Sequence, residues 1–107
     1  YQALTISGVN AAIGSTYNIV PEIVIAIFNA VKNADHQKAN QLHCEYRKYW
    51  LSIQGFSFLG FGSYFLTKRG FKMGNPRHPL RWPEKQEIDI VEDRLSKSGF
   101  KLETGGI

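Results

Sequence analysis

The amino-acid sequence predicts an α/β protein segment that is mostly helical, in which one short strand precedes a series of helices. An apolar stretch of strand length, VNAAIG at residues 9–14, indicates the strand. Apolar residues at three- and four-residue steps, in stretches bounded by Gly and Pro, indicate helices between residues 21 and 98. A lone buried strand would leave its N–H and C=O groups unpaired, so we expect its partner strands to belong to a larger α/β protein.

The composition is that of a globular protein. The chain of 107 residues is 43% hydrophobic and 21% charged, which argues against a disordered or a membrane-spanning chain. The longest apolar run, residues 23–28, is far shorter than the ~20 residues that cross a bilayer. The net charge of +4 is too small to indicate nucleic acid as a partner.

Two further features concern compartment and origin. The single cysteine, Cys44, excludes an internal disulfide and favours a reducing compartment. The chain starts at Tyr1 rather than at Met. We therefore expect residues 1–107 to be part of a longer polypeptide.

The first 20 residues are expected to hold a helix end, the strand and a turn. Residues 1–7 are interpreted as the last turns of a helix, with Gly8 as its C-terminal cap. The buried strand at residues 9–14 then leads into the small and hydroxyl-bearing residues of GSTYN, residues 14–18.

The next two elements are helices. Pro21 suits the first position of a helix over residues 21–32, where its missing N–H costs nothing. This helix is apolar nearly all round, so we expect it to be buried on more than one side. A second helix begins near the capping residues 33–35 and ends at Gly55. Its apolar face comprises Ala39, Leu42, Tyr46, Tyr49 and Ile53.

The second half of the chain predicts two more helices. Residues 57–70 are expected to form a helix with close-packing glycines that ends at Gly70, followed by a loop rich in Pro and Gly. Pro83 opens the last helix, which ends at Gly99 in a cap of Schellman type. Residues 101–107 are expected to be a frayed tail.

Two stretches resemble a known family. GVNAAIGSTYNIVPE, residues 8–22, resembles the eighth-strand segment of the N-acetylneuraminate lyase group within the dihydrodipicolinate synthase superfamily. TKRGFKMGNPRHPL, residues 67–80, resembles the late segment of the same group, where a glycine-bearing turn precedes a PR-x-PL loop. The order and spacing of the helices between these two stretches also agree with the family.

The resemblance implies the C-terminal part of a TIM (β/α)8 barrel. Residues 1–20 would be the end of the barrel with its eighth strand, and residues 21–107 would be C-terminal helices. The family enzymes are cytosolic homotetramers that form a Schiff base between a lysine and the 2-keto group of a sugar acid. Cleavage of a carbon–carbon bond then gives pyruvate and N-acetylmannosamine, without a metal ion or a cofactor.

The resemblance also implies the roles of two residues. Barrel active sites lie at the C-terminal ends of the strands, where small polar residues line the pocket. Ser15 would hydrogen-bond the bound sugar chain, and Gly14 would let the backbone approach the ligand closely. The family's Schiff-base lysine, its tyrosine acid/base and its carboxylate-binding Thr-Thr turn belong to earlier segments, so we expect no catalytic residue here and no catalysis by these residues alone.

The hydroxyl residues of the turn have a simpler alternative role. Ser15 and Thr16 could cap the helix that follows by satisfying backbone donors. Tyr17 could border the pocket or be an ordinary packing residue.

The histidines and the cysteine predict no metal site. His43 and Cys44 are adjacent, so they point to different faces of a helix, and no pair of ligands four residues apart exists. We interpret Cys44 as a small packing residue.

A second hypothesis comes from a different functional class. The chain would be a truncated, non-catalytic helical binding module with an anion-binding loop at residues 68–81. Six side chains form this basic cluster: Lys68, Arg69, Lys72, Arg77, His78 and Arg81. The aromatic-rich residues 56–65 would expose an apolar patch in an isolated segment, and in a barrel tetramer they are expected to pack against other helices or another subunit.

Overall fold

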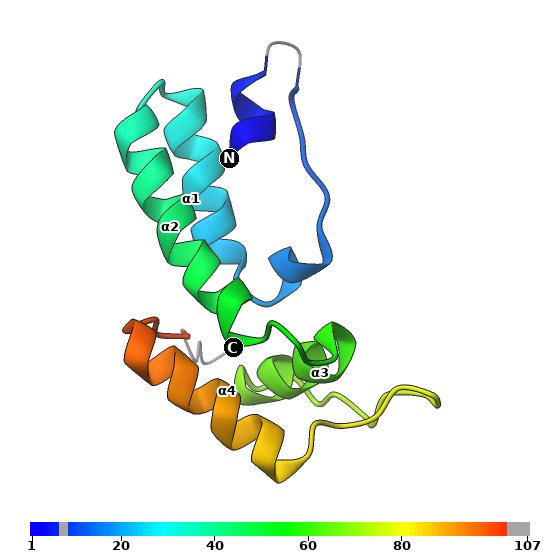
Figure 1. Cartoon of the computed structure of the whole chain (residues 1–107). Helices are drawn as coiled ribbons and strands as arrows, with labels where there is room; N and C mark the ends of the chain where they lie inside the picture. The colour runs from blue at the N-terminus through cyan, green and yellow to red at the C-terminus, as the bar shows by residue number, and fades with distance from the viewer. Residues whose placement is uncertain (7–8, 103–107) are drawn as a thin grey trace. The chain divides into compact units, whose positions relative to one another are not determined.

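The computed structural model describes residues 1–6 and 9–102 (Figure 1). The chain divides into two compact units, Tyr1–Arg47 and Lys48–Ile107, and each is described below by itself. The described residues form four α-helices and two short 3-10 turns, so the prediction of a mostly helical segment is confirmed. No helix in these ranges combines the length and the apolar character needed to cross a membrane.

The strand expected at residues 9–14 does not form within the described residues, and the segment is exposed rather than buried. The segment connects two 3-10 turns, η1 (Gln2–Thr5) and η2 (Ser15–Asn18), and Figure 1 draws it as an elongated ribbon. Gly14 has extended backbone angles, but residues 9–13 are exposed and Ile13 is fully so. A strand needs a neighbour for its N–H and C=O groups, and residues 1–6 and 9–102 contain no other strand.

The predicted helix end is not seen in residues 1–6, where the structure has the single turn η1. The predicted cap of that helix, Gly8, lies outside the described residues. The predicted tail at residues 101–107 lies largely outside them as well.

Helix α1 (Pro21–Lys32) belongs to the first unit and begins as predicted. Pro21 lies in the first turn together with Glu22, whose charge suits the positive end of the helix dipole. Ile27 and Ala30 are buried, and the helix contacts both η1 and η2. Ile25 is 57% exposed, so burial on several sides is not seen in this chain.

Helix α2 (His36–Ser52) starts in the first unit and ends in the second. The Asp35 carboxylate accepts a hydrogen bond from the Lys38 N–H at 3.0 Å, which caps the first turn. Ala39 and Tyr49, both on the predicted apolar face, are fully buried. Gly55, the predicted end, follows with a left-handed φ of +92° that favours glycine.

The second unit contains α3 (Phe58–Lys68) and α4 (Lys85–Ser98). The Ser57 hydroxyl accepts a hydrogen bond from the Gly60 N–H at 3.2 Å and caps α3. Helix α4 starts two residues after Pro83, with a capping box between Glu84 and Glu87. Gly99 ends α4 in the left-handed conformation, as predicted.

Aromatic side chains make up much of the core of this second unit. Phe65 is fully buried, and its ring lies 5.6 Å from the Tyr49 ring and 5.9 Å from the Phe61 ring. A methyl group at Gly60 would lie 2.8 Å from the Arg81 carbonyl oxygen. The predicted close-packing glycine is therefore confirmed, and the predicted packing role of the aromatic residues is confirmed for Phe61 and Phe65.

Candidate functional site

Gly14 and Ser15, the two residues that the sequence predicts to bind substrate, lie where the extended segment meets the turn η2. Gly14 ends the extended segment, and Ser15 is the first residue of η2. Ser15 is exposed, and its carbonyl oxygen accepts a hydrogen bond from Asn18 Nδ2 at 3.0 Å. The Tyr17 N–H donates to the Gly14 carbonyl oxygen at 3.1 Å and closes the turn.

Gly14 has a structural reason to be glycine. A methyl group at this position would lie 2.8 Å from Cζ and 2.9 Å from Cε1 of Tyr17, closer than real Cβ atoms come. The absent side chain thus makes room for the Tyr17 ring. The expectation that Gly14 also makes room for a ligand stays a prediction.

Thr16 connects the turn to α2. Its hydroxyl shares a hydrogen bond with the Tyr46 hydroxyl, 30 residues further along the chain. Neither η2 nor α1 has a side-chain cap in its first turn, so the alternative capping role of Ser15 and Thr16 is not seen. The sequence places Tyr46 on the apolar face of its helix but does not predict its bond to Thr16, because no local pattern indicates which distant side chain meets Thr16.

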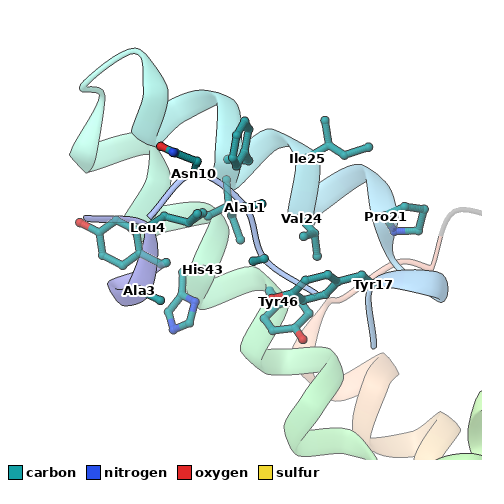
Figure 2. Close-up of a pocket in the computed structure, with 14 residues that line it drawn as sticks. Ala3, Leu4, Asn10, Ala11, Tyr17, Pro21, Val24, Ile25, His43 and Tyr46 are labelled. Atoms are coloured by element: carbon teal, nitrogen blue, oxygen red, sulfur yellow. The ribbon is translucent and has the colours of Figure 1, made fainter. Parts of the chain in front are cut away.

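A cavity of about 410 Å³ lies beside this turn, within the first unit (Figure 2). Its walls come from both 3-10 turns, residues 10–12, α1 and α2, and are mostly apolar. Val24 and Phe28 of α1 line it, as do Tyr17 and Tyr46. Tyr17 lines this cavity, whereas Gly14 and Ser15 are not among the lining residues, so its place beside the substrate pocket stays a prediction.

His43 also lines this cavity. Its ring centroid lies 5.9 Å from that of Tyr1 and 6.4 Å from that of Tyr46. Partial burial, together with the nearby charge of Arg47, lowers the pKa of His43, so the neutral imidazole is favoured. The histidine is thus a weakly basic hydrogen-bonding group in a largely apolar wall.

In the described part of the chain, Cys44 and the residue types that bind metal ions form no metal site. Cys44 is exposed, so its predicted packing role is wrong, because this position on α2 points to solvent. Residues 1–6 and 9–102 contain no group of three His, Cys, Asp or Glu side chains that could hold a metal ion.

Part of the predicted basic cluster is neutralised by α4. Lys68 forms an ion pair with Glu92 at 2.7 Å, and Arg81 forms two bonds to Glu87 at 2.7 and 2.8 Å. The bond from Arg81 lowers the pKa of Glu87. Lys72, Arg77 and His78 are exposed on the loop between these pairs.

Glu92 is the centre of a small polar network in the second unit. It also accepts a hydrogen bond from the Tyr64 hydroxyl at 2.8 Å. Partial burial acts to raise the pKa of Glu92, but the bonds from Lys68 and Tyr64 outweigh it and the pKa is lowered. Burial and the bond to Glu92 raise the pKa of Tyr64. This network joins α3 to α4 and has a structural role.

The lysines of the chain lack the environment that Schiff-base chemistry needs. A nucleophilic lysine must be partly neutral at working pH, which requires burial or a neighbouring cation. None of the eight lysines is buried.

Comparisons with family models, curated proteins and solved structures gave no match to this chain, so the family resemblance stays a prediction.

Proposed function

We propose that residues 1–107 form the C-terminal part of an N-acetylneuraminate lyase-like Schiff-base aldolase, a cytosolic homotetramer that cleaves sialic acid to pyruvate and N-acetylmannosamine. Residues 9–14 would be the eighth strand of a TIM barrel, and Ser15 would bind the sugar chain of the substrate. The single observation that carries the proposal is the exposed, apolar segment at residues 9–14, which has no strand beside it among residues 1–6 and 9–102 and leads directly into the Gly14-Ser15 turn and an apolar helix.

The energetics of this segment favour a larger assembly. Ile13 is fully exposed, and burying a side chain of its size contributes about 1.5–3 kcal/mol. Neighbouring strands would also offer hydrogen-bond partners to the main-chain groups of residues 10–13. A barrel supplies both, since each strand has a neighbour on either side and a helix layer behind it.

The proposed chemistry assigns the covalent steps to residues outside this sequence. A lysine amine adds to the 2-keto carbon, water leaves, and an imine forms. A tyrosine removes the proton of the substrate hydroxyl, the bond between the carbons α and β to the imine breaks, and its electron pair moves toward the imine as an enamine. Protonation of the enamine and hydrolysis release pyruvate and restore the lysine. Ser15 would hold the sugar chain while these steps occur.

The test is an activity assay on the complete source polypeptide. Incubation with N-acetylneuraminate is expected to release pyruvate, measured by coupled oxidation of NADH. Ser15→Ala removes one hydrogen bond to the substrate and is expected to raise KM roughly 3- to 10-fold. Ser96→Ala is the matched control, since Ser96 is an exposed residue of α4. Absence of pyruvate release from the wild-type polypeptide would contradict the proposal.

The alternative function, a helical module with an anion-binding loop at residues 68–81, has less support. Two of its six candidate groups, Lys68 and Arg81, already pair with carboxylates of α4. A polypeptide that releases no pyruvate but binds inorganic phosphate through Lys72 and Arg77 would favour this alternative.

A further inference from the structure

We infer that Tyr46 and Tyr17 are positioning residues that hold Ser15 in place for the substrate, Tyr46 through Thr16 and Tyr17 through Gly14. The inference rests on the proposed function, because it assigns these residues to the same substrate site. Neither tyrosine is assigned a contact with the substrate.

The turn that bears Ser15 has little support of its own. It is a 3-10 helix of four residues with no buried residue and no side-chain cap. Such a short element contributes few backbone hydrogen bonds, and its orientation is set by what its neighbours touch. Ser15 itself is exposed.

Both neighbours of Ser15 are held by tyrosine side chains. On one side, the Tyr17 ring packs onto the Gly14 backbone so closely that a methyl group there would lie 2.8 Å from the ring. On the other side, the Thr16 hydroxyl is bonded to Tyr46. The bond from Asn18 Nδ2 to the Ser15 carbonyl oxygen, at 3.0 Å, adds a third restraint within the turn.

Helix α2 gives this arrangement a firm base. Tyr46 lies in the middle of a helix of 17 residues, and a bond to the helix therefore restrains the turn more than a bond to another loop would. Figure 2 shows the Tyr17 and Tyr46 side chains, which come from different elements, at the same end of the cavity. A hydroxyl that binds substrate must be placed to within about 0.5 Å, and packed neighbours supply this accuracy.

The test measures kinetics of the complete polypeptide with N-acetylneuraminate. Tyr46→Phe keeps the ring and removes the hydroxyl, and we expect KM to rise roughly 3- to 10-fold with little change in kcat. Thr16→Val should have the same effect, whereas Thr16→Ser should restore the wild-type KM. In the Ser15→Ala background, Tyr46→Phe should add nothing to KM, because the two changes remove one interaction.

A matched control separates positioning from stability. Tyr64→Phe removes the hydroxyl of another tyrosine, one that donates to Glu92 in the second unit. This variant is expected to lower the melting temperature about as much as Tyr46→Phe does, without a change in KM. If Tyr46→Phe fails to fold, the comparison of Thr16→Ser with Thr16→Val tests the same bond from its other end.

The outcomes distinguish this inference from the proposed function. Pyruvate release by the wild type, with an unchanged KM in Tyr46→Phe and Thr16→Val, would overturn the inference and leave the function standing. No pyruvate release by the wild type would overturn both. Equal rises in KM for Tyr46→Phe and Tyr64→Phe would mean a general loss of stability and would also overturn the inference.

Discussion

The contact between α3 and the backbone of Arg81 makes Gly60 the most informative position for a stability measurement. In Gly60→Ala, the new methyl group would lie 2.8 Å from the Arg81 carbonyl oxygen and 3.4 Å from Ser57 Oγ. The carbonyl cannot turn away easily, because the buried Pro83 follows two residues later. The Ser57 hydroxyl cannot move without weakening the cap of α3.

Two opposing effects set the magnitude. Ala is favoured over Gly inside a helix by about 1 kcal/mol, whereas overpacking costs about 1–3 kcal/mol, so we expect a net loss of about 1 kcal/mol. A loss of this size lowers the melting temperature of a domain of this length by about 4–8 °C. The difference in helix propensity alone would make Gly60→Ala more stable than the wild type.

The assay is thermal and urea unfolding of the chain followed by circular dichroism. Gly74→Ala is the control, since a methyl group at Gly74 meets nothing within 4 Å and its φ is not left-handed. We expect this control to match the wild type to within about 0.5 kcal/mol. If Gly60→Ala were instead more stable than the wild type, the close approach of Arg81 to α3 would be refuted.

Three further predictions concern the second unit. Ser57→Ala removes the cap of α3 and should cost about 1 kcal/mol in urea unfolding, and a loss near zero would mean that the bond to Gly60 contributes nothing. Phe65→Ala empties a fully buried site and should cost about 3–5 kcal/mol, so a variant with near wild-type stability would contradict the aromatic core. The bonds from Lys68 and Tyr64 hold the folded-state pKa of Glu92 below the usual value of a glutamate. Its charged form therefore stabilises the fold above that usual value, and this contribution is lost as pH falls through the folded pKa. The stability difference between the wild type and Glu92→Gln should therefore be present at pH 7 and shrink toward pH 3, and a difference independent of pH would rule out this role of the carboxylate.

Local signals in the sequence predicted the helices well. The start of α1 follows from Pro21, whose missing N–H is harmless only in the first turn of a helix. The ends of α3 and α4 follow from Gly70 and Gly99, which adopt the left-handed φ that other residues avoid. Such signals depend on a few neighbouring residues, so they can be interpreted without knowledge of the fold.

Features that depend on distant residues could not be predicted in this way. The hydrogen bond between Thr16 and Tyr46 spans 30 residues, and the one between Lys68 and Glu92 spans 24. Whether residues 9–14 form a strand depends in the same way on a neighbouring strand, which the apolar pattern does not reveal. Within the candidate site, local sequence signals predicted the position of the turn at Gly14 and Ser15 but not the side chains that hold it.

The proposed function depends on a lysine outside residues 1–107, and one measurement tests this directly. The complete source protein is incubated with pyruvate, reduced with borohydride, and its intact and peptide masses are determined. Borohydride adds hydride to the imine carbon and converts the Schiff base into a stable secondary amine. We predict one pyruvate-sized adduct per polypeptide, on a lysine other than the eight in this sequence. No adduct, or an adduct on one of those eight exposed or half-exposed lysines, would contradict the assignment to a Schiff-base aldolase.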